Sequence, residues 1–386
     1  MAEASVPSAF RRSPALPRGF ALDGDDISRS LYLLPTGLVW GEQAAAAIIS
    51  GNGWPLAEGW AAFTSLGVAL RDENGGSLAV APFNDVVEWA EGEGPDVARH
   101  VGRAVQRMGA KRPAWGGLAM DRPVIMGIVN ATPDSFSDGG EAFTAETAIA
   151  RALSMVEAGA SIIDVGGEST RPGADPVPVE EEERRVLPVV CSLAERNICV
   201  SIDTRHARIM AAAVAAGARI INDVTALAGD PDSLAVAAGC KADLCLMHMQ
   251  GDDPRTMQTD PQYACAPLDV FDGLARRLEV CRAAGIALSR ICVDPGIGFG
   301  KSPIHNAQIL GSLSLLHGFG CPILLGVSRK SFVARLSRGE DAKHRLPGTL
   351  AAELAGLDAG MQILRVHDVP ETVQAVTIWR SMRQGG

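Results

Sequence analysis

The stretch that decides the fold runs from Pro123 to Gly140 and reads PVIMGIVNATPDSFSDGG. It begins with a largely apolar run rich in β-branched side chains, which is typical of a strand buried on both faces. Asn130 ends this run, and a segment rich in Gly, Pro, Ser and Asp follows. Such a segment favours a loop at the end of a strand. A single junction of this kind is common in proteins. It therefore indicates a particular fold only if the chain repeats it.

The same junction recurs from about residue 122 to the end of the chain. After each loop, apolar residues spaced three or four apart predict a helix. Eight strands in about 265 residues predict a (β/α)8 barrel over residues 113–386. An open, doubly wound sheet is the alternative, because eight parallel strands can also lie flat. The strand-like runs are VIMGIVN130, SIIDVGG167, ICVSIDT204, RIINDV224, ADLCLMH248, RICVDPG296, CPILLGVSR329 and MQILRVH367.

The first 112 residues lack this regular cycle. We predict a flexible N-terminus over residues 1–25 and a small α+β module of unknown role over residues 26–112. In this module we expect strands in LYLLPTGLVWG and GGSLAVAPF and a helix in EGPDVARHVGRAVQRMGA. The piece WGGLAMDRPV at 115–124 predicts a hairpin that closes the barrel floor. Because every candidate site residue lies after position 129, we expect residues 1–112 to be dispensable for the chemistry.

Composition bounds the function. The chain of 386 residues has a net charge of -10, which argues against a general binder of nucleic acid or of anionic membranes. Its eight cysteines form no C-x-x-C pair and no cluster at zinc-ligand spacing. Gly, Pro or Glu interrupts the apolar stretches before they reach membrane-spanning length. We therefore expect a soluble, cytoplasmic protein with reduced cysteines.

Polar side chains stand at the carboxyl ends of the predicted strands, where (β/α)8 enzymes place their chemistry. An isolated Asn or Asp at such a position is more often a turn former or a helix N-cap, which is how we interpret Asp164 and Asp223. Seven polar residues on one rim favour a binding site instead. They are Asn130, Asp203, Asn222, Asp294, Lys330, Arg365 and His367.

This set divides by chemistry. Asp203, Asn222 and Asp294 offer acceptors and amide donors that suit a planar heterocycle with an amino-amide edge. The other predicted group consists of cations that suit an anion, namely Lys330, Arg365 and His367. The segment GIGFGKS at 296–302 lacks the P-loop spacing, so its glycines predict a tight turn beside Asp294.

Two loops have unusual content, NATPDSFSDGG and GGESTRPGADPV. Both are long enough to move as lids, although passive connectors are the alternative. In the second loop Arg171 stands between Thr170 and Pro172, where a cation without a partner is costly. We expect it to close over an anion when substrate binds.

Seven motifs resemble those of the dihydropteroate synthase family, pterin-binding (β/α)8 enzymes of folate synthesis. The resemblance covers residues 115–386, and it does not cover residues 1–112. It implies a transferase that joins 4-aminobenzoate to 7,8-dihydropterin-6-ylmethyl diphosphate and releases 7,8-dihydropteroate and diphosphate. The motifs are MGIVNATPDSFSDGG, DVGGESTRPGA, SIDTR, IINDV, DPGIGFGK, GVSRKSF and LRVHDV.

The resemblance also implies a role for each matching residue, a Mg²⁺ cofactor with Asn130 as its protein ligand, a homodimer, and sensitivity to sulfonamides. The residues implied for chemistry are Asp138, Arg171 and Lys330. Those implied for the pterin diphosphate are Thr170, Asp203, Asn222, Asp294, Lys330, Arg365 and His367. Those implied for 4-aminobenzoate are Phe136, Arg171, Pro172, Ser328 and Ser331.

Two other functions remain possible. A methyltetrahydrofolate-dependent methyltransferase would share the Asp/Asn/Asp pterin set, but it has no reason to keep STRPG, SRKS or the pair Arg365 and His367. A non-catalytic pterin-binding protein should have lost some rim residues, and none is missing here.

Overall fold

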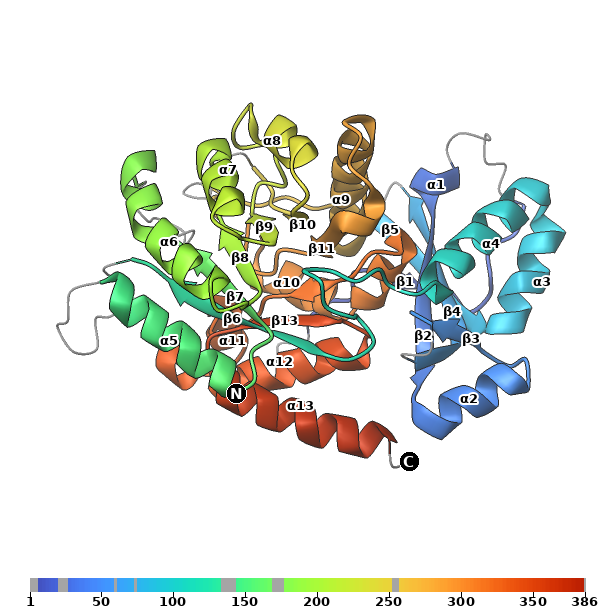
Figure 1. The fold of residues 1–386 in the computed structure, drawn as a ribbon. Helices are drawn as coiled ribbons and strands as arrows, with labels where there is room; N and C mark the ends of the chain where they lie inside the picture. The colour runs from blue at the N-terminus through green and yellow to red at the C-terminus, as the bar shows by residue number, and fades with distance from the viewer. Residues whose placement is uncertain are drawn as a thin grey trace.

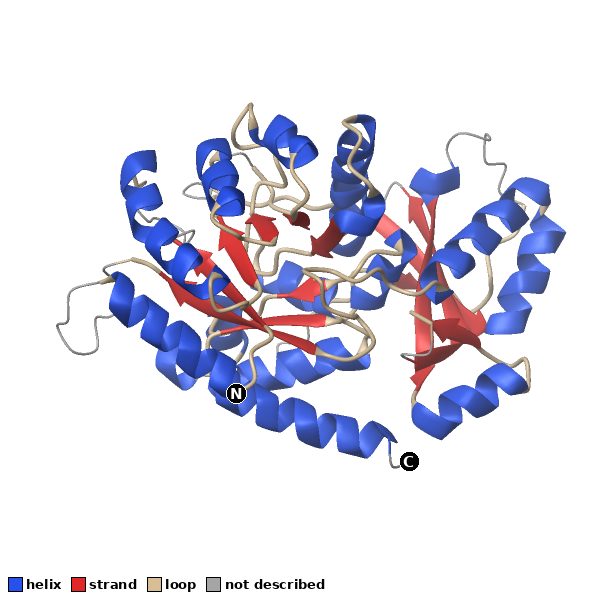
Figure 2. Cartoon of the chain, viewed as in Figure 1, coloured by secondary structure: helices blue, strands red, loops and turns tan. Residues whose placement is uncertain are grey.

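The structure is a computed structural model that describes residues 6–19, 27–58, 61–72, 75–132, 144–168, 177–251 and 257–384. Figure 1 shows two parts side by side, a larger ring of strands with helices around it and a smaller sheet with its own helices. In the larger part the strands lie inside and the helices outside, as Figure 2 shows.

The larger part is a barrel of eight parallel strands in the order β11-β10-β9-β8-β7-β6-β13-β12. Its two ends meet, because Val293 on β11 forms a parallel bridge with Ile323, next to β12. Sequential order with meeting ends excludes the open doubly wound sheet, and the predicted (β/α)8 barrel is confirmed. The strands are β6 (Val124–Asn130), β7 (Ile162–Gly166), β8 (Val200–Asp203), β9 (Ile220–Asp223), β10 (Asp243–Met247), β11 (Ile291–Asp294), β12 (Leu324–Leu325) and β13 (Ile363–Val366).

Helices separate the strands, and some of these helices begin at a residue that caps their N-terminus. Thr144 begins α5 with a capping box, in which its hydroxyl accepts a bond from the backbone N–H of Thr147. The α-helices of the barrel are α5 (Ala145–Glu157), α6 (Val179–Ala194), α7 (Ala207–Ala215), α8 (Ser233–Gly239), α9 (Ala266–Ala283), α10 (Pro303–Leu310), α11 (Ser331–Leu336), α12 (Leu346–Asp358) and α13 (Val369–Gln384). Short 3₁₀ helices are η2 (Leu288–Arg290), η3 (Leu313–Phe319) and η4 (Ala342–His344).

The barrel floor is closed by the hairpin that the sequence predicts. Trp115 pairs with Leu118, is fully buried, and donates its indole N–H to the backbone oxygen of Leu244 at 3.2 Å. It packs among residues of the barrel strands, including Met126 and Ile363. The opposite, carboxyl end of the barrel is therefore the end left for binding. All eight cysteines are free thiols, and six of them are buried.

The smaller part is a five-stranded sheet with path β1-β5-β4-β2, and β3 pairs with β4. The predicted strands and helix are present, but the sequence reading missed β4, the central strand. Its Ala, Gly and Ser content gives a weak strand signal, whereas pairing on both sides stabilises it. The elements are β1 (Arg11–Arg12), α1 (Ile27–Ser30), β2 (Leu31–Val39), α2 (Gly41–Ile49), β3 (Trp54–Leu56), β4 (Ala61–Asp72), β5 (Gly75–Pro82), α3 (Phe83–Glu93) and α4 (Pro95–Gly109).

The prediction of a flexible N-terminus over residues 1–25 is wrong for residues 6–19. Arg11 and Arg12 form a parallel strand on β5, and the N–H of Ser13 bonds to Leu78 at 2.9 Å. Phe10 is buried at 6% exposure. The composition of this segment, with its Pro, Ser and Arg residues, gives no strand signal, because the short edge strand is stabilised only by its pairing with β5.

The two parts share an apolar core. Trp40 and Trp379 pack edge to face with ring centroids 5.0 Å apart, and Tyr32 meets Phe271 in the same way at 5.7 Å. A chain lacking residues 1–112 would therefore expose apolar surface of the barrel, which favours aggregation. All candidate rim residues belong to the barrel, but the structure gives no support for expecting that the barrel folds well alone.

We expect Arg71→Ala to lower the free energy of unfolding by about 2 kcal/mol, because it breaks charge-assisted bonds between the two parts. The guanidinium of Arg71, on β4, lies 2.7 Å from Asp269 and 2.8 Å from Asp272, both on α9. Arg11→Ala is the matched control, since Arg11 pairs with Asp72 at an exposed edge and should change little. Urea unfolding measures the free energy of unfolding of both variants. Equal losses in the two would contradict a special role for Arg71 between the two parts.

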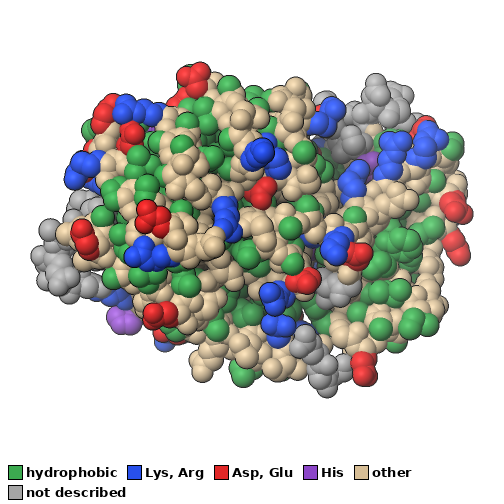
Figure 3. Space-filling view, in the orientation of Figure 1, with side chains coloured by type: hydrophobic (Ala, Val, Ile, Leu, Met, Phe, Trp, Pro, Cys, Tyr) green, Lys and Arg blue, Asp and Glu red, His purple; other side chains and the backbone are tan. Residues whose placement is uncertain are grey.

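The surface carries charge of both signs. Figure 3 shows Lys and Arg side chains interspersed with Asp and Glu over the face drawn, with no single large cationic field there. Among the described residues, no helix combines the length and apolarity needed to cross a bilayer.

Candidate active site

The strand register places Asn130, Asp203 and Asn222 in line, with Asp294 two residues farther along its strand. Asn130 at the end of β6 stands opposite Gly166, which pairs with Asp203, which in turn pairs with Asn222. On the next strands Met247 pairs with Asp294. Because parallel neighbours end together, four of the predicted side chains line one arc of the barrel mouth.

Arg365 on β13 crosses the mouth and joins this arc. Its Nε donates to Asp164 Oδ2 and its Nη2 donates to Asp203 Oδ2, each at 2.6 Å. Asn222 Nδ2 donates to the same Asp164 oxygen at 3.1 Å. These bonds to charged groups hold the four side chains in fixed positions.

Asp164 is a site residue that the sequence reading missed. It is neither a turn former nor a helix cap, because it lies within β7 and is fully buried. Its Oδ1 has no hydrogen-bond partner among the described residues. The available signal was a charged residue inside the apolar run SIIDV, since a buried charge requires a partner.

Asp294 and Lys330 approach one another on the other side of the mouth. A methyl group added at Gly326 would lie 3.8 Å from Lys330 Nζ and 3.9 Å from Asp294 Oδ2, so both side chains converge on the space that this glycine leaves. Asp294 Oδ1 accepts the N–H of Gly296 at 2.7 Å. Lys330 Nζ donates to the backbone oxygen of Ile297 and lies 4.6 Å from the centroid of the Phe299 ring.

Burial dominates the electrostatics of the mouth. It raises the pKa of Asp203 to about 7, although the Arg365 guanidinium acts in the opposite direction. It also raises the pKa of Asp294, against the nearby Lys330 ammonium, and lowers the pKa of Lys330 to about 8. A ligand that offers N–H donors to the carboxylates would favour their ionised forms.

His367 differs from the prediction in its charge. Burial, and then the Arg365 guanidinium, lower the pKa of His367 to about 3, so its imidazole is neutral at physiological pH. The predicted role of His367 in binding an anion stays a prediction, and burial disfavours the positive charge that it assumed. Its Nδ1 lies 3.0 Å from Ser328 Oγ, which also accepts the His367 backbone N–H at 3.1 Å. His367 can therefore offer a hydrogen bond to an anion, and an anion beside it would in turn favour the protonated ring.

Two further interpretations, of Asp223 and of the glycines beside Asp294, are confirmed. Asp223 is a turn former, because its carboxylate accepts the backbone N–H groups of Thr225 at 2.7 Å and Leu227 at 2.9 Å. Gly296 forms the predicted tight turn, with a φ of 67°. A methyl group there would lie 1.9 Å from the backbone oxygen of His248, so only glycine fits.

The structure places two other predicted residues at the same end of the barrel. Asn130 is half-buried, and Ser331 is exposed at the start of α11, directly after Lys330. Five predicted residues lie outside the described ranges, so their roles stay predictions. They are Phe136, Asp138, Thr170, Arg171 and Pro172.

Comparison with known proteins agrees with this geometry. The pterin binding enzyme family matches residues 126–367. The dihydropteroate synthase of Escherichia coli K12 is 44% identical over 262 residues, which are 68% of this chain and 92% of that protein. The structure of Xanthomonas albilineans dihydropteroate synthase with 4-aminobenzoic acid is similar at 46% identity and a TM-score of 0.65, covering 69% of this chain and 95% of that one.

A Yersinia pestis dihydropteroate synthase with a sulfonamide drug complex is 44% identical, with a TM-score of 0.66 and coverage of 70% of this chain and 97% of that one. The family match begins within the first barrel strand, so the N-terminal sheet lies outside it. The chain belongs to the pterin-binding enzyme family, within its dihydropteroate synthases.

Proposed function

We propose that this chain condenses 4-aminobenzoate with 7,8-dihydropterin-6-ylmethyl diphosphate, giving 7,8-dihydropteroate and diphosphate. The observation that carries the proposal is the buried polar array at the barrel mouth, Asp164, Asp203, Asn222, Asp294, Lys330 and Arg365. It supplies fixed acceptors and donors for one planar, polar heterocycle. The related enzyme of Xanthomonas albilineans, which is named with 4-aminobenzoic acid, supports the choice of second substrate.

The pterin would bind among the carboxylates. The unpartnered Asp164 Oδ1, together with Asp203 and Asp294, can accept the N–H groups of the amino-amide edge. Asn222 and Lys330 can donate to the ring carbonyl and nitrogens. Arg365 Nε and Nη2 already donate to Asp164 and Asp203, so the main role of Arg365 in pterin binding would be to orient these carboxylates. Its predicted contact with the diphosphate would use the other edge of the guanidinium.

The proposed Mg²⁺ fits the residue present. Asn130 offers one neutral amide oxygen at the end of β6, and Mg²⁺ commonly takes few protein ligands and completes its shell with water and phosphate oxygens. When bound, the metal would neutralise part of the diphosphate charge. His367 would donate a hydrogen bond to the same anion, and Arg171 would approach it from the second loop.

The main catalytic task is to stabilise a departing polyanion while the pterin develops positive charge at its exocyclic methylene. The ionised Asp203 and Asp294 favour that positive charge and hold the ring in place. The aniline nitrogen of 4-aminobenzoate is a free nucleophile at neutral pH, so no strong general base is needed. We place its ring beside Phe136, Pro172 and Ser328, with the carboxylate at Ser331.

A direct assay tests this function. Purified protein is incubated with the pterin diphosphate, 4-aminobenzoate and Mg²⁺, and the products are separated and identified. We expect dihydropteroate and diphosphate in equal amounts. No product from folded protein would contradict the proposal, and methyl transfer from methyltetrahydrofolate in a parallel reaction would favour the alternative enzyme.

We also propose a cytoplasmic homodimer. Eight free cysteines suit a reducing compartment. Ile378 and Met382, one helical turn apart on α13, are 57% and 63% exposed and offer apolar surface for a second copy. Sedimentation of the wild type and of a Met382→Glu variant tests this, and an unchanged dimer in the variant would exclude this face.

Sulfonamides should inhibit by competing with 4-aminobenzoate, because they keep its aniline amine and replace the carboxylate by a sulfonyl group. We expect binding only after pterin diphosphate, or diphosphate with Mg²⁺, because we expect the loop that carries Arg171 to close over that anion. Inhibition at rising 4-aminobenzoate, with calorimetry in the presence and absence of the pterin ligand, measures both points. Tight drug binding to the enzyme without pterin ligand would contradict this order of binding.

A further inference from the structure

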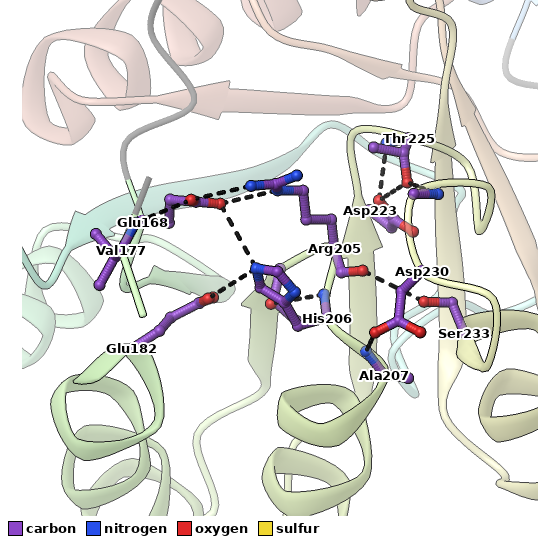
Figure 4. Close-up of polar contacts among 12 residues, drawn as sticks. Glu168, Val177, Glu182, Arg205, His206, Ala207, Asp223, Thr225, Asp230 and Ser233 are labelled. Atoms are coloured by element: carbon purple, nitrogen blue, oxygen red, sulfur yellow. Dashed lines mark hydrogen bonds and ion pairs between the residues drawn. The ribbon is translucent and has the colours of Figure 1, made fainter. Parts of the chain in front are cut away.

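A second polar cluster lies at the outer side of the barrel mouth, apart from the pterin array. Glu168 follows β7, Glu182 is on α6, and His206 precedes α7. Figure 4 shows the two carboxylates directed at the same imidazole. His206 Nε2 lies 3.7 Å from Glu182 Oε2 and 4.0 Å from Glu168 Oε2, and one ligand atom from each residue lies within 4.8 Å of the others.

Glu182 is the unusual member. It is fully buried, and neither carboxylate oxygen has a hydrogen-bond partner among the described residues. His206 Nε2, which faces it, has none either. Burial raises the pKa of Glu182 to about 7, while the neighbouring Thr204 hydroxyl acts against that change. A buried carboxylate without bonds is costly, so a natural cluster of this kind needs a proton or a cation.

The residue types and their spacing suit a transition metal. Imidazole nitrogen and carboxylate oxygen are both zinc ligands, and a water molecule can complete the tetrahedron around three protein ligands. With metal–ligand bonds of 2.0–2.1 Å, tetrahedral ligand atoms lie about 3.3 Å apart. The observed separations of 3.7 and 4.0 Å exceed this by less than 1 Å, which small side-chain rotations can close.

Neighbouring residues already orient one ligand. Arg205 donates Nε to Glu168 Oε2 at 3.0 Å and Nη2 to Oε1 at 3.2 Å, and the backbone N–H of Val177 donates to Oε1 at 3.2 Å. Such outer bonds fix the position of a metal-binding carboxylate. Two carboxylates and one guanidinium leave one negative charge, which a divalent cation would offset.

We propose that Glu168, Glu182 and His206 form a zinc-binding site, distinct from the predicted Mg²⁺ position at Asn130. The ion would connect two consecutive βα units, because Glu168 and Glu182 belong to the β7–α6 unit and His206 to the β8–α7 unit. Its role is structural, since none of the three ligands belongs to the pterin array. The proposed condensation does not depend on it.

The experiment measures zinc binding by the whole chain. Protein treated with a chelator and then dialysed is titrated with Zn²⁺ by calorimetry, and Tm is followed with and without the ion. We expect one saturable site, with a higher Tm when it is filled. Mg²⁺ should not fill this site, because it does not favour an imidazole ligand.

Three variants locate the site. His206→Ala and Glu182→Gln should each weaken zinc binding by at least about tenfold, no less than the loss of an outer-shell partner. Glu182→Gln should also raise the Tm of the zinc-free protein, because it removes a buried unpaired charge. His344→Ala is the matched control, since His344 contacts only the exposed carboxylate of Asp341 in the 2.8 Å pair and should leave zinc binding unchanged.

The proposal is overturned if wild-type protein shows no saturable zinc site and no zinc-dependent change in Tm. It is also overturned if His206→Ala and Glu182→Gln bind zinc as the wild type does, because the ion would then lie elsewhere. Calorimetry and Tm report zinc binding without reference to the condensation. A failure of this proposal is therefore separable from a failure of the proposed function.

Discussion

Replacing Asp203 by asparagine is expected to reduce kcat/KM of the condensation by at least about a hundredfold, which corresponds to about 2.7 kcal/mol. Asp203 is 9% exposed and receives a 2.6 Å bond from Arg365. Asparagine keeps the size and one acceptor oxygen but removes the charge that faces the cationic pterin in the transition state. It also leaves Arg365 with one carboxylate partner instead of two, so the array loses its alignment.

The matched control is Asp243→Asn. Asp243 is also a partly buried carboxylate at a strand end, but it lies at the barrel floor, where it accepts the N–H of Gly116 at 2.7 Å. An asparagine oxygen can keep that bond, so activity should remain close to the wild type. Steady-state kinetics at pH 7.5, with circular dichroism to confirm folding, compares the two. Wild-type kinetics in a folded Asp203→Asn variant would show that the pterin binds elsewhere.

The sequence was sufficient for the barrel and for most of its rim. Parallel strands that are buried on both faces produce long apolar runs, and polar residues that end such runs stand out. Asp203, Asn222 and Asp294 were found in this way, and the structure brings them to one end of the barrel. Asp164 was missed because it lies inside a strand, and its partner Arg365 is 201 positions away in the sequence.

Properties that depend on three-dimensional surroundings could not be read from the sequence. The lowered pKa of His367 results from its burial and from the guanidinium of Arg365, two residues earlier on β13. The edge strand at Arg11–Arg12 exists only because β5 offers a free edge. The cluster of Glu168, Glu182 and His206 joins two neighbouring βα units. No local pattern encodes such contacts, because they arise when the barrel closes.

Lys330→Ala is the second substitution expected to cost at least about a hundredfold in kcat/KM. Lys330 is the ammonium that approaches Asp294 across the space left by Gly326, and it acts on this carboxylate more strongly than Arg365 or Lys301 does. Alanine removes a donor to the pterin and leaves Asp294 without its nearest cation. The loss should appear in both kcat and KM, because in the proposed complex the lysine would contact the bound ring before and during the reaction.

The pH profile provides a test of this role. Because burial lowers the pKa of Lys330 to about 8, its ammonium is present below pH 8 and lost above it. The pKa of Asp203 is raised to about 7, so its carboxylate is mostly ionised only above pH 7. If the reaction needs both charges, kcat/KM of the wild type should be greatest between about pH 7 and pH 8.

The decline above pH 8 should not reflect unfolding through Lys330. The pKa of Lys330 in the folded protein is about 8, below the ordinary lysine value of 10.5. Between these two values the unfolded chain binds more protons, so this group's contribution to stability rises with pH. Lys330→Arg separates the remaining explanations. An arginine stays charged, so whatever activity this variant retains should show no decline near pH 8. If the decline persists unchanged in Lys330→Arg, another group causes it, and Lys330 is not the required cation.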